Sequence, residues 1–220
     1  MHLRPRLAAP FLTALLAVAA LAGCASDGWS APHPEPSAVG VVGPGFVPTA
    51  TPSPEATVEP VAGSWRGVHP SKGYRVVLLT AGDDAPTREL VAAVRDWAHD
   101  EDVALRTVRA DGELVDGIVR AMKLEPDLIV SAGNELVDPL ATVTASHLDQ
   151  KFLVVGAEVA EPTANVTAAD WTGASFRGEG LGMSSGYDPG TFTAARCGAA
   201  VRAGVAAVLT GLTGVVLWID

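Results

Sequence analysis

Four polar side chains follow predicted strands of this chain, at the positions where α/β proteins bind ligands. Asp83 and Asp84 follow one buried apolar run, Asn134 follows a later run, and Glu158 follows the next. Because the carboxyl ends of parallel strands lie along one edge of a sheet, these residues are candidates for binding a small polar ligand. Each also has a structural interpretation, since Asp84 and Asn134 are residue types that cap helices.

No pattern in the sequence predicts catalysis. Zinc-ligand spacing, a glycine-rich phosphate loop and paired catalytic carboxylates are all missing from it. The segment 182–186 matches the nucleophile-elbow pattern, but no strand is predicted before it and no helix after it. Asp83 and Asp84 resemble the acidic pair of a receiver domain, but the third strand ends at Ser131 with no carboxylate to accept a phosphate. We therefore expect no enzyme activity, no metal site and no cofactor.

Apolar runs alternate with amphipathic segments from residue 74 onward, which is typical of β/α units. The runs are continuous, as strands covered on both faces require. The prediction is a three-layer α/β domain over 73–220, with a parallel sheet of five to six strands and right-handed crossovers. Strands are expected at 74–81, 103–108, 127–132, 152–155, 165–169 and 215–219, and helices at 86–100, 113–124, 138–148 and 192–209.

The stretch from Ala203 to Ile219 carries no charge and raises the question of a membrane-spanning segment. It is shorter than the roughly 20 residues that a bilayer requires, and Gly211 to Gly214 predicts a turn within it. We favour a buried helix that leads into a core strand, with membrane association as the alternative.

Cys24 has the most specific chemistry in the chain. It closes the motif Leu21-Ala22-Gly23-Cys24, which follows two arginines and a short apolar stretch. This is the order of a secretory signal peptide that ends in a bacterial lipobox. Cleavage would remove residues 1–23, and two acyl chains on Cys24 would give stable anchoring to the lipid bilayer. The predicted location is the extracytoplasmic face of the bacterial cell membrane.

Removal of residues 1–23 takes the formal net charge from −10 to −12, because the segment holds two arginines and no acidic residue. Such an acidic chain has little attraction for a phosphate backbone, so we expect no nucleic-acid binding. Cys197 is left without an intrachain partner and is expected to be a buried packing residue.

Residues 24–72 are predicted to form the lipidated cysteine and a disordered tether. The segment after Cys24 holds nine of the 16 prolines and lacks any apolar period. A tether of that length would span roughly 40 to 150 Å. Trp29, Phe46 and Trp65 are isolated aromatics within it, either docking residues or incidental.

Four segments of the domain carry a resemblance to a known family, namely Pro126–Asn134, Lys151–Val155, Asn165–Thr167 and Phe176–Glu179. In sequence and order they resemble the first lobe of the basic membrane protein family. Members of that family are lipid-anchored substrate-binding proteins of ABC importers with the type I periplasmic-binding-protein fold, and characterised relatives bind purine nucleosides. The resemblance implies a single lobe of that fold, a small polar ligand and an ABC permease as partner.

The chain also departs from the family pattern. Asp83-Asp84-Ala85-Pro86-Thr87 stands where the family usually has an aspartate followed by Ser-Phe-Asn, and Gly156 stands where it usually has an aspartate. The second lobe, which closes over the ligand in such proteins, has no counterpart in residues 1–220.

Two functions remain open from the sequence. The first is an extracytoplasmic lipoprotein that binds a small polar solute, such as a nucleoside, through Asp83, Asp84, Asn134 and Glu158. The second is a degenerate single-lobe lipoprotein that acts as a surface interaction or structural module without solute transport. An open pocket onto which Asn134 and Glu158 converge would favour the first, and a filled strand-end face would favour the second.

Overall fold

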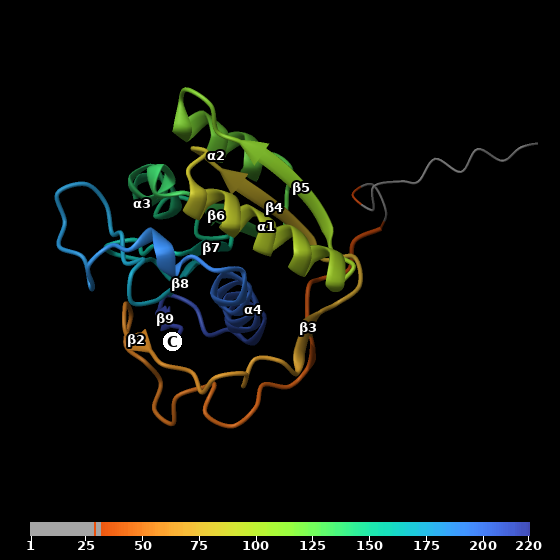
Figure 1. The fold of residues 1–220 in the computed structure, drawn as a ribbon. Helices are drawn as coiled ribbons and strands as arrows, with labels where there is room; N and C mark the ends of the chain where they lie inside the picture. Colours follow the sequence, from red (N-terminus) through yellow and green to blue (C-terminus); the bar gives the residue numbers. More distant parts are fainter. Residues whose placement is uncertain (1–28, 30–31) are drawn as a thin grey trace, which may run out of the picture.

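The computed structural model describes residue 29 and residues 32–220. A seven-stranded parallel sheet dominates it, in the order β2-β9-β8-β7-β6-β4-β5 (Figure 1). The strands are β2 (Thr57–Val58), β4 (Arg75–Thr80), β5 (Ala104–Arg109), β6 (Leu128–Ala132), β7 (Phe152–Val155), β8 (Val166–Asp170) and β9 (Val216–Trp218). The helices are α1 (Ala85–Asp100), α2 (Leu114–Met122), α3 (Val137–Thr144) and α4 (Ala194–Thr210), with two 3-10 turns, η1 (Asn134–Leu136) and η2 (Pro189–Thr191).

Helices cover both faces of the sheet, which confirms the predicted three-layer α/β architecture. Helices α1 and α4 pack on one face and α2 and α3 on the other, as Figure 1 shows. Alternate residues of β4 supply the two cores, with Val76 and Leu78 facing α1 and Val77 and Leu79 facing α2. The chain leaves β4 for β5 on one side and returns to β6 on the other. The β4–β6 junction is therefore the topological switch point.

Helix α1 lies close to its predicted bounds, and its start is encoded by local residues. Asp84 is the N-cap residue, and its side chain accepts a hydrogen bond of 2.9 Å from the Thr87 amide. Pro86 lies in the first turn, where the missing amide hydrogen costs nothing. The apolar side of the helix then packs on the sheet through Leu90, Val94 and other buried residues.

Helix α4 packs in the core with eight of its 17 residues buried, and its second half forms the first part of the uncharged stretch. Thr193 caps its start, and Gly211 ends it in the left-handed conformation. Gly204 has no room for a side chain, since a Cβ there would lie 2.4 Å from a methyl carbon of Leu153. Cys197 is fully buried, as predicted, and burial raises its thiol pKa to about 12. Among the described residues, no helix combines the length and apolar character needed to cross a bilayer.

Residues 32–72 do not form the predicted disordered tether; they pack against the α/β domain (Figure 1). β1 (Ala38–Gly40) pairs antiparallel with β3 (Val68–Pro70), and β2 adds a parallel strand beside β9. Phe46 is fully buried and Trp65 almost so, both in the core cluster that contains α4. The prediction failed because the segment has no periodicity of its own, and its order comes from the surface that it covers. The sheet gains its seventh strand in the same way.

Candidate functional site

The polar residues expected at the carboxyl edge of the sheet lie at that edge but do not form one site. Asp83 borders an open pocket, Asp84 is a helix cap, Asn134 is not part of the lining of that pocket, and Glu158 is buried elsewhere. The sequence predicted the correct edge of the sheet, but it did not predict which of these residues the intervening loops would cover and which they would leave open.

Asp84 is fully engaged in building the start of α1. One carboxylate oxygen accepts from the Thr87 amide at 2.9 Å, and the other accepts from the Thr87 hydroxyl at 2.8 Å. Of the two interpretations that the sequence allowed for this residue, the structural one agrees with the geometry. A ligand would compete with this cap.

Asp83 is exposed and borders an open pocket of about 440 Å³ between the later parts of β4 and β5 and the part of α1 from Thr87 to Arg95. Thr80, at the end of β4, is 6% exposed, and its hydroxyl has no hydrogen-bond partner within the described chain. Unsatisfied buried hydroxyls are rare in proteins and are normally paired once water or a ligand is present. The full lining is Thr80, Gly82, Asp83, Thr87, Arg88, Val91, Ala92, Arg95, Thr107 and Arg109.

Three arginines give this pocket a positive charge that the sequence analysis did not anticipate. The Arg88 guanidinium donates to the Asp83 backbone carbonyl, and Arg109 Nε donates to Asp111 at 2.7 Å. Arg95 is exposed one heptad after Arg88, on the same side of α1. That seven-residue spacing, together with an arginine ending β5, was a usable sequence signal.

Asn134 lies just after β6 at the switch point, half-buried, and is not part of the pocket lining. It does not cap a helix with its side chain, since Gly133 is the N-cap residue of η1. Gly133 has a φ of +119°, and a Cβ there would lie 2.4 Å from the Ala81 carbonyl oxygen. The glycine is therefore required for the close approach of the β4 and β6 ends.

Glu158 lies in a polar cluster beneath the loop that follows β8. Its carboxylate accepts a hydrogen bond of 2.6 Å from Ser184 and lies 3.2 Å from Arg177 Nε. The Glu158 amide also donates to the Phe176 carbonyl at 2.8 Å. The side chain is 7% exposed and does not line the pocket that Asp83 borders, so it is not placed to meet a solute with Asp83.

Asp170, the last residue of β8, forms a carboxyl pair with Glu158 that the sequence analysis did not find. One Asp170 oxygen accepts from the Trp171 and Ser175 amides at 2.8 and 3.0 Å. The Asp170 pKa is raised from 3.8 to about 7: burial is the largest cause and the nearby Glu158 carboxylate adds to the rise, whereas the two amide hydrogen bonds oppose it. A proton on Asp170 that faces Glu158 removes the repulsion between the two carboxylates. The residues are 12 positions apart, and only the pairing of β7 with β8 brings them together.

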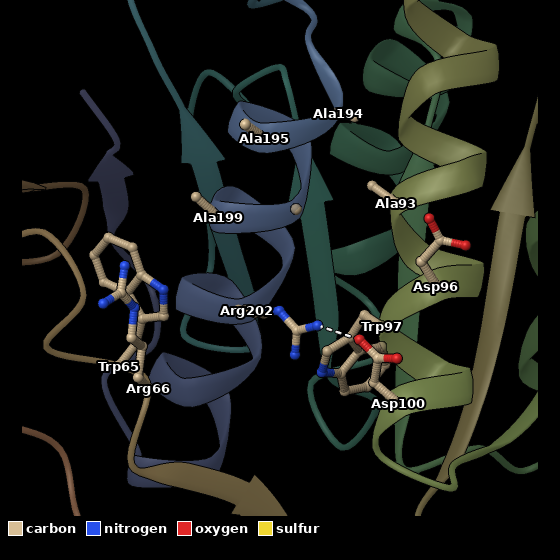
Figure 2. Close-up of a pocket in the computed structure, with 11 residues that line it drawn as sticks. Trp65, Arg66, Ala93, Asp96, Trp97, Asp100, Ala194, Ala195, Ala199 and Arg202 are labelled. Atoms are coloured by element: carbon tan, nitrogen blue, oxygen red, sulfur yellow. Dashed lines mark hydrogen bonds and ion pairs between the residues drawn. The ribbon is translucent and has the colours of Figure 1, made fainter.

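A second pocket of about 440 Å³ lies on the helical face between α1 and α4 (Figure 2). Trp65 and Arg66 border it from the N-terminal segment, and Trp97 lines it from α1. Arg202 is bound to Asp100 at 2.7 Å, the contact drawn as a dashed line. A smaller cavity of about 240 Å³ shares Trp65, Arg66, Trp97 and Arg202 with it. The charged side chains that line the larger pocket are both basic and acidic.

The described residues contain no cluster of three or more histidine, cysteine, aspartate or glutamate side chains that could hold a metal ion.

Comparison with known proteins gives structural likeness without a family assignment. No family model matches the sequence, and no curated protein matches it. The fold is similar to ABC transporter solute-binding proteins from Aeropyrum pernix K1 and Conexibacter woesei DSM 14684, at 20% and 16% identity and TM-scores of 0.39 and 0.36. These alignments cover 45% and 44% of this chain and 29% and 35% of the other chains.

A fragment of a lipoprotein from Peptoclostridium difficile 630 is also similar, at 14% identity and a TM-score of 0.44. That alignment covers 63% of this chain and 99% of the fragment. The chain spans about a third of the length of the solute-binding proteins that it matches. All of these TM-scores are below 0.5, so the likeness carries no argument about function. The resemblance to the basic membrane protein family gains no support from a family model.

Proposed function

We propose that this protein is an extracytoplasmic lipoprotein that binds a small polar solute at the carboxyl edge of its sheet. The observation that carries the proposal is the open pocket bordered by Asp83, where three arginines and three threonines gather at the ends of β4 and β5. Its volume of about 440 Å³ lies within the range of small-molecule sites, roughly 300 to 1,000 Å³. The pocket lies toward the carboxyl ends of the strands, where open α/β sheets bind ligands, but beside the β4–β5 pair and not at the β4–β6 switch point.

The lining favours a solute that carries both hydroxyl groups and an anionic group. Arginine guanidinium groups bind carboxylates and phosphates through paired hydrogen bonds. Asp83 and the threonine hydroxyls suit the hydroxyl groups of a sugar ring. A phosphorylated or carboxylated sugar or nucleoside therefore fits better than a neutral nucleoside, which is the ligand class that the family resemblance implies. The proposed role is binding and not catalysis.

The lipid anchor rests on the motif that ends at Cys24, which lies outside the described residues. An ABC permease is the partner that this proposal implies for the bound solute. Mass spectrometry of the mature protein tests the anchor: residues 1–23 are expected to be missing, with acyl chains on Cys24. A Cys24→Ser variant is expected to stay unprocessed or to leave the membrane fraction.

A thermal-shift screen tests the pocket. The panel contains neutral nucleosides, nucleoside monophosphates, sugars, sugar phosphates and dicarboxylates. A solute at a hundredfold excess over its Kd stabilises the fold by about 2.7 kcal/mol. Arg95→Ala and Asp83→Ala are expected to weaken binding of the solute found. Arg66→Ala is the matched control, because it removes an exposed arginine from the other pocket; loss of binding there, with Arg95→Ala unaffected, would contradict the assignment.

The second candidate function is a surface interaction module without solute transport. It is favoured by the loop after β8, which covers Glu158 and fills the strand ends of β7 and β8. The same loop exposes Leu181, Met183 and Tyr187, each more than 40% accessible. This candidate is favoured if no solute of the panel raises the melting temperature of the wild-type protein and none raises that of any pocket variant.

A further inference from the structure

The first described residue, Trp29, docks at the edge of the sheet where the parallel strands begin. Its indole Nε1 donates a hydrogen bond of 2.8 Å to the Leu124 carbonyl, in the connection between α2 and β6. The Arg106 guanidinium carbon lies 4.5 Å from the centre of a Trp29 ring, and that of Arg75 lies 5.9 Å from it. Arginine over an indole face is a favourable cation–π contact.

His33 fixes the next part of the chain at the same edge. Its Nε2 lies 2.7 Å from one oxygen of Asp127, and the other oxygen of Asp127 accepts a hydrogen bond of 2.8 Å from the Arg75 amide. Arg75 is the first residue of β4, and Asp127 directly precedes β6. Trp29 and His33 therefore hold the incoming chain at the amino edge of the two central strands.

The pocket lies at the opposite edge. Strand β4 runs from Arg75, beside the docked chain, to Thr80, which lines the pocket. Six residues of strand separate the two edges by about 20 Å. In Figure 1 the arrowheads of β4 and β5 point away from the side where the described chain enters.

The spacing between Cys24 and Trp29 limits how far the domain can move from an anchor. Five residues span at most about 18 Å when fully extended. A compact domain of this size is about 40 Å across. For the face opposite Trp29 to reach the lipid, the link from Cys24 to Trp29 would have to span the full width of the domain. That width is more than twice the greatest length of the link.

We propose that the amino edge of the sheet faces the lipid bilayer and that the pocket edge points away from it, open to the extracytoplasmic space. This inference rests on the proposed acylation of Cys24. The partner surface is the bilayer itself, and the contact is set by the short link and the Trp29 dock. The expected tether of 40 Å or more would have allowed every orientation.

The test places one fluorescent label at each edge of the full-length lipidated protein in vesicles whose head groups carry a nitroxide quencher. Lys72→Cys puts the label on an exposed residue just before β4, and Glu113→Cys puts it on an exposed residue just after β5. Cys197 is buried and stays unlabelled in the folded protein. The label at position 72 is expected to lose most of its fluorescence, and the label at position 113 is expected to keep it.

Two further variants test the cause of the orientation. Ten glycine and serine residues inserted between Cys24 and Trp29 extend the reach to about 50 Å and should abolish the difference between the two labels. Trp29→Ala moves the first fixed point to His33 and should reduce the difference. Equal quenching of both labels, or stronger quenching at position 113, would overturn the proposed orientation.

A flotation assay, carried out before any quenching is measured, tests the lipid anchor separately from the orientation. Unlabelled protein is expected to float with the vesicles, and Cys24→Ser is expected to stay behind. If the wild-type protein does not float, the proposed acylation and the proposed orientation are both contradicted. A chain that floats and quenches equally at both positions contradicts the orientation alone.

Discussion

Arg177 lies 3.2 Å from the Glu158 carboxylate, and this ion pair fixes the loop after β8 to the end of β7. Ser184 in the same loop binds the other Glu158 oxygen at 2.6 Å. Asp170 supplies a third group, and burial raises the pKa of its carboxyl group from 3.8 to about 7. The cluster explains why Glu158 is not a pocket residue: its hydrogen-bonding capacity is used within the fold.

Replacement of Arg177 by methionine is expected to destabilise the protein. The variant leaves the Glu158 charge next to Asp170 without its cation, and a buried charge that loses its partner costs about 2 kcal/mol when the pair is partly exposed, as here. Urea denaturation at pH 7 measures the change. Arg66→Met is the control, since Arg66 is exposed, and it should stay within about 0.5 kcal/mol of wild type. Equal losses in both variants would remove the special role of the cluster.

Asp170 predicts a pH dependence of stability with a definite sign. Its pKa is raised from 3.8 to about 7, so the folded chain holds a proton that the unfolded chain has released between those values. This contribution is complete below the unfolded pKa of 3.8 and is lost as the pH rises through about 7. Stability from this residue therefore falls with increasing pH across that window.

Asp170→Asn isolates the effect, because asparagine mimics the protonated carboxyl group and keeps an oxygen for the Trp171 and Ser175 amides. Denaturation curves from pH 4.5 to 8 should show a difference between variant and wild type that moves in favour of the variant as the pH rises. Parallel curves would mean that Asp170 is ionised throughout the range.

Asp84 is predicted to matter for stability, and Asp83 is not. Loss of an N-cap acceptor costs about 1 kcal/mol, so Asp84→Ala should lower the unfolding free energy by that amount. Asp84→Asn keeps an acceptor for the Thr87 amide and should recover most of the loss. Thermal and urea unfolding give both values. An Asp83→Ala variant as unstable as Asp84→Ala would show that the two adjacent residues had been assigned the wrong roles.

The two asparagines of the chain are also expected to differ in how much they contribute to stability. Asn165 is 1% exposed, and its amide nitrogen donates to the carbonyl oxygens of Thr144, His147 and Gln150 at 2.9 to 3.1 Å. Asn165→Asp places a carboxylate against three carbonyl oxygens and should cost about 3 kcal/mol or more. Asn134→Asp, at the half-buried switch point, should change stability by less than about 0.5 kcal/mol. Circular dichroism during urea unfolding compares the pair.

The predicted strands and helices of the domain lie close to those observed because each is encoded by its own residues. The run over β4 is apolar from Val76 to Leu79, and Asp84 followed by Pro86 marks the start of α1. The third helix is the main difference in length: the structure begins with η1 at Asn134 and ends α3 at Thr144, whereas the prediction ran from 138 to 148. Local periodicity does not fix such ends.

The candidate site was less predictable than the fold. Topology alone led to Asp83, which does border a pocket, and to Glu158, which does not. A residue that follows a strand is exposed or covered according to the next loop, and the glycine-rich loop after β8 has no pattern that predicts its path. The arginines of the pocket come from α1 and β5, so their proximity depends on how the helix packs on the sheet.

The sequence by itself determined the α/β class, the order of the domain's main elements and the edge of the sheet where a site could form, because apolar periodicity and helix caps act over a few residues. Tertiary structure alone decided that residues 32–72 pack on the domain, that Glu158 and Asp170 share a buried position, and that Trp29 docks at the amino edge. Each of these depends on contacts between residues far apart in the chain or on a surface that exists only after the sheet has formed.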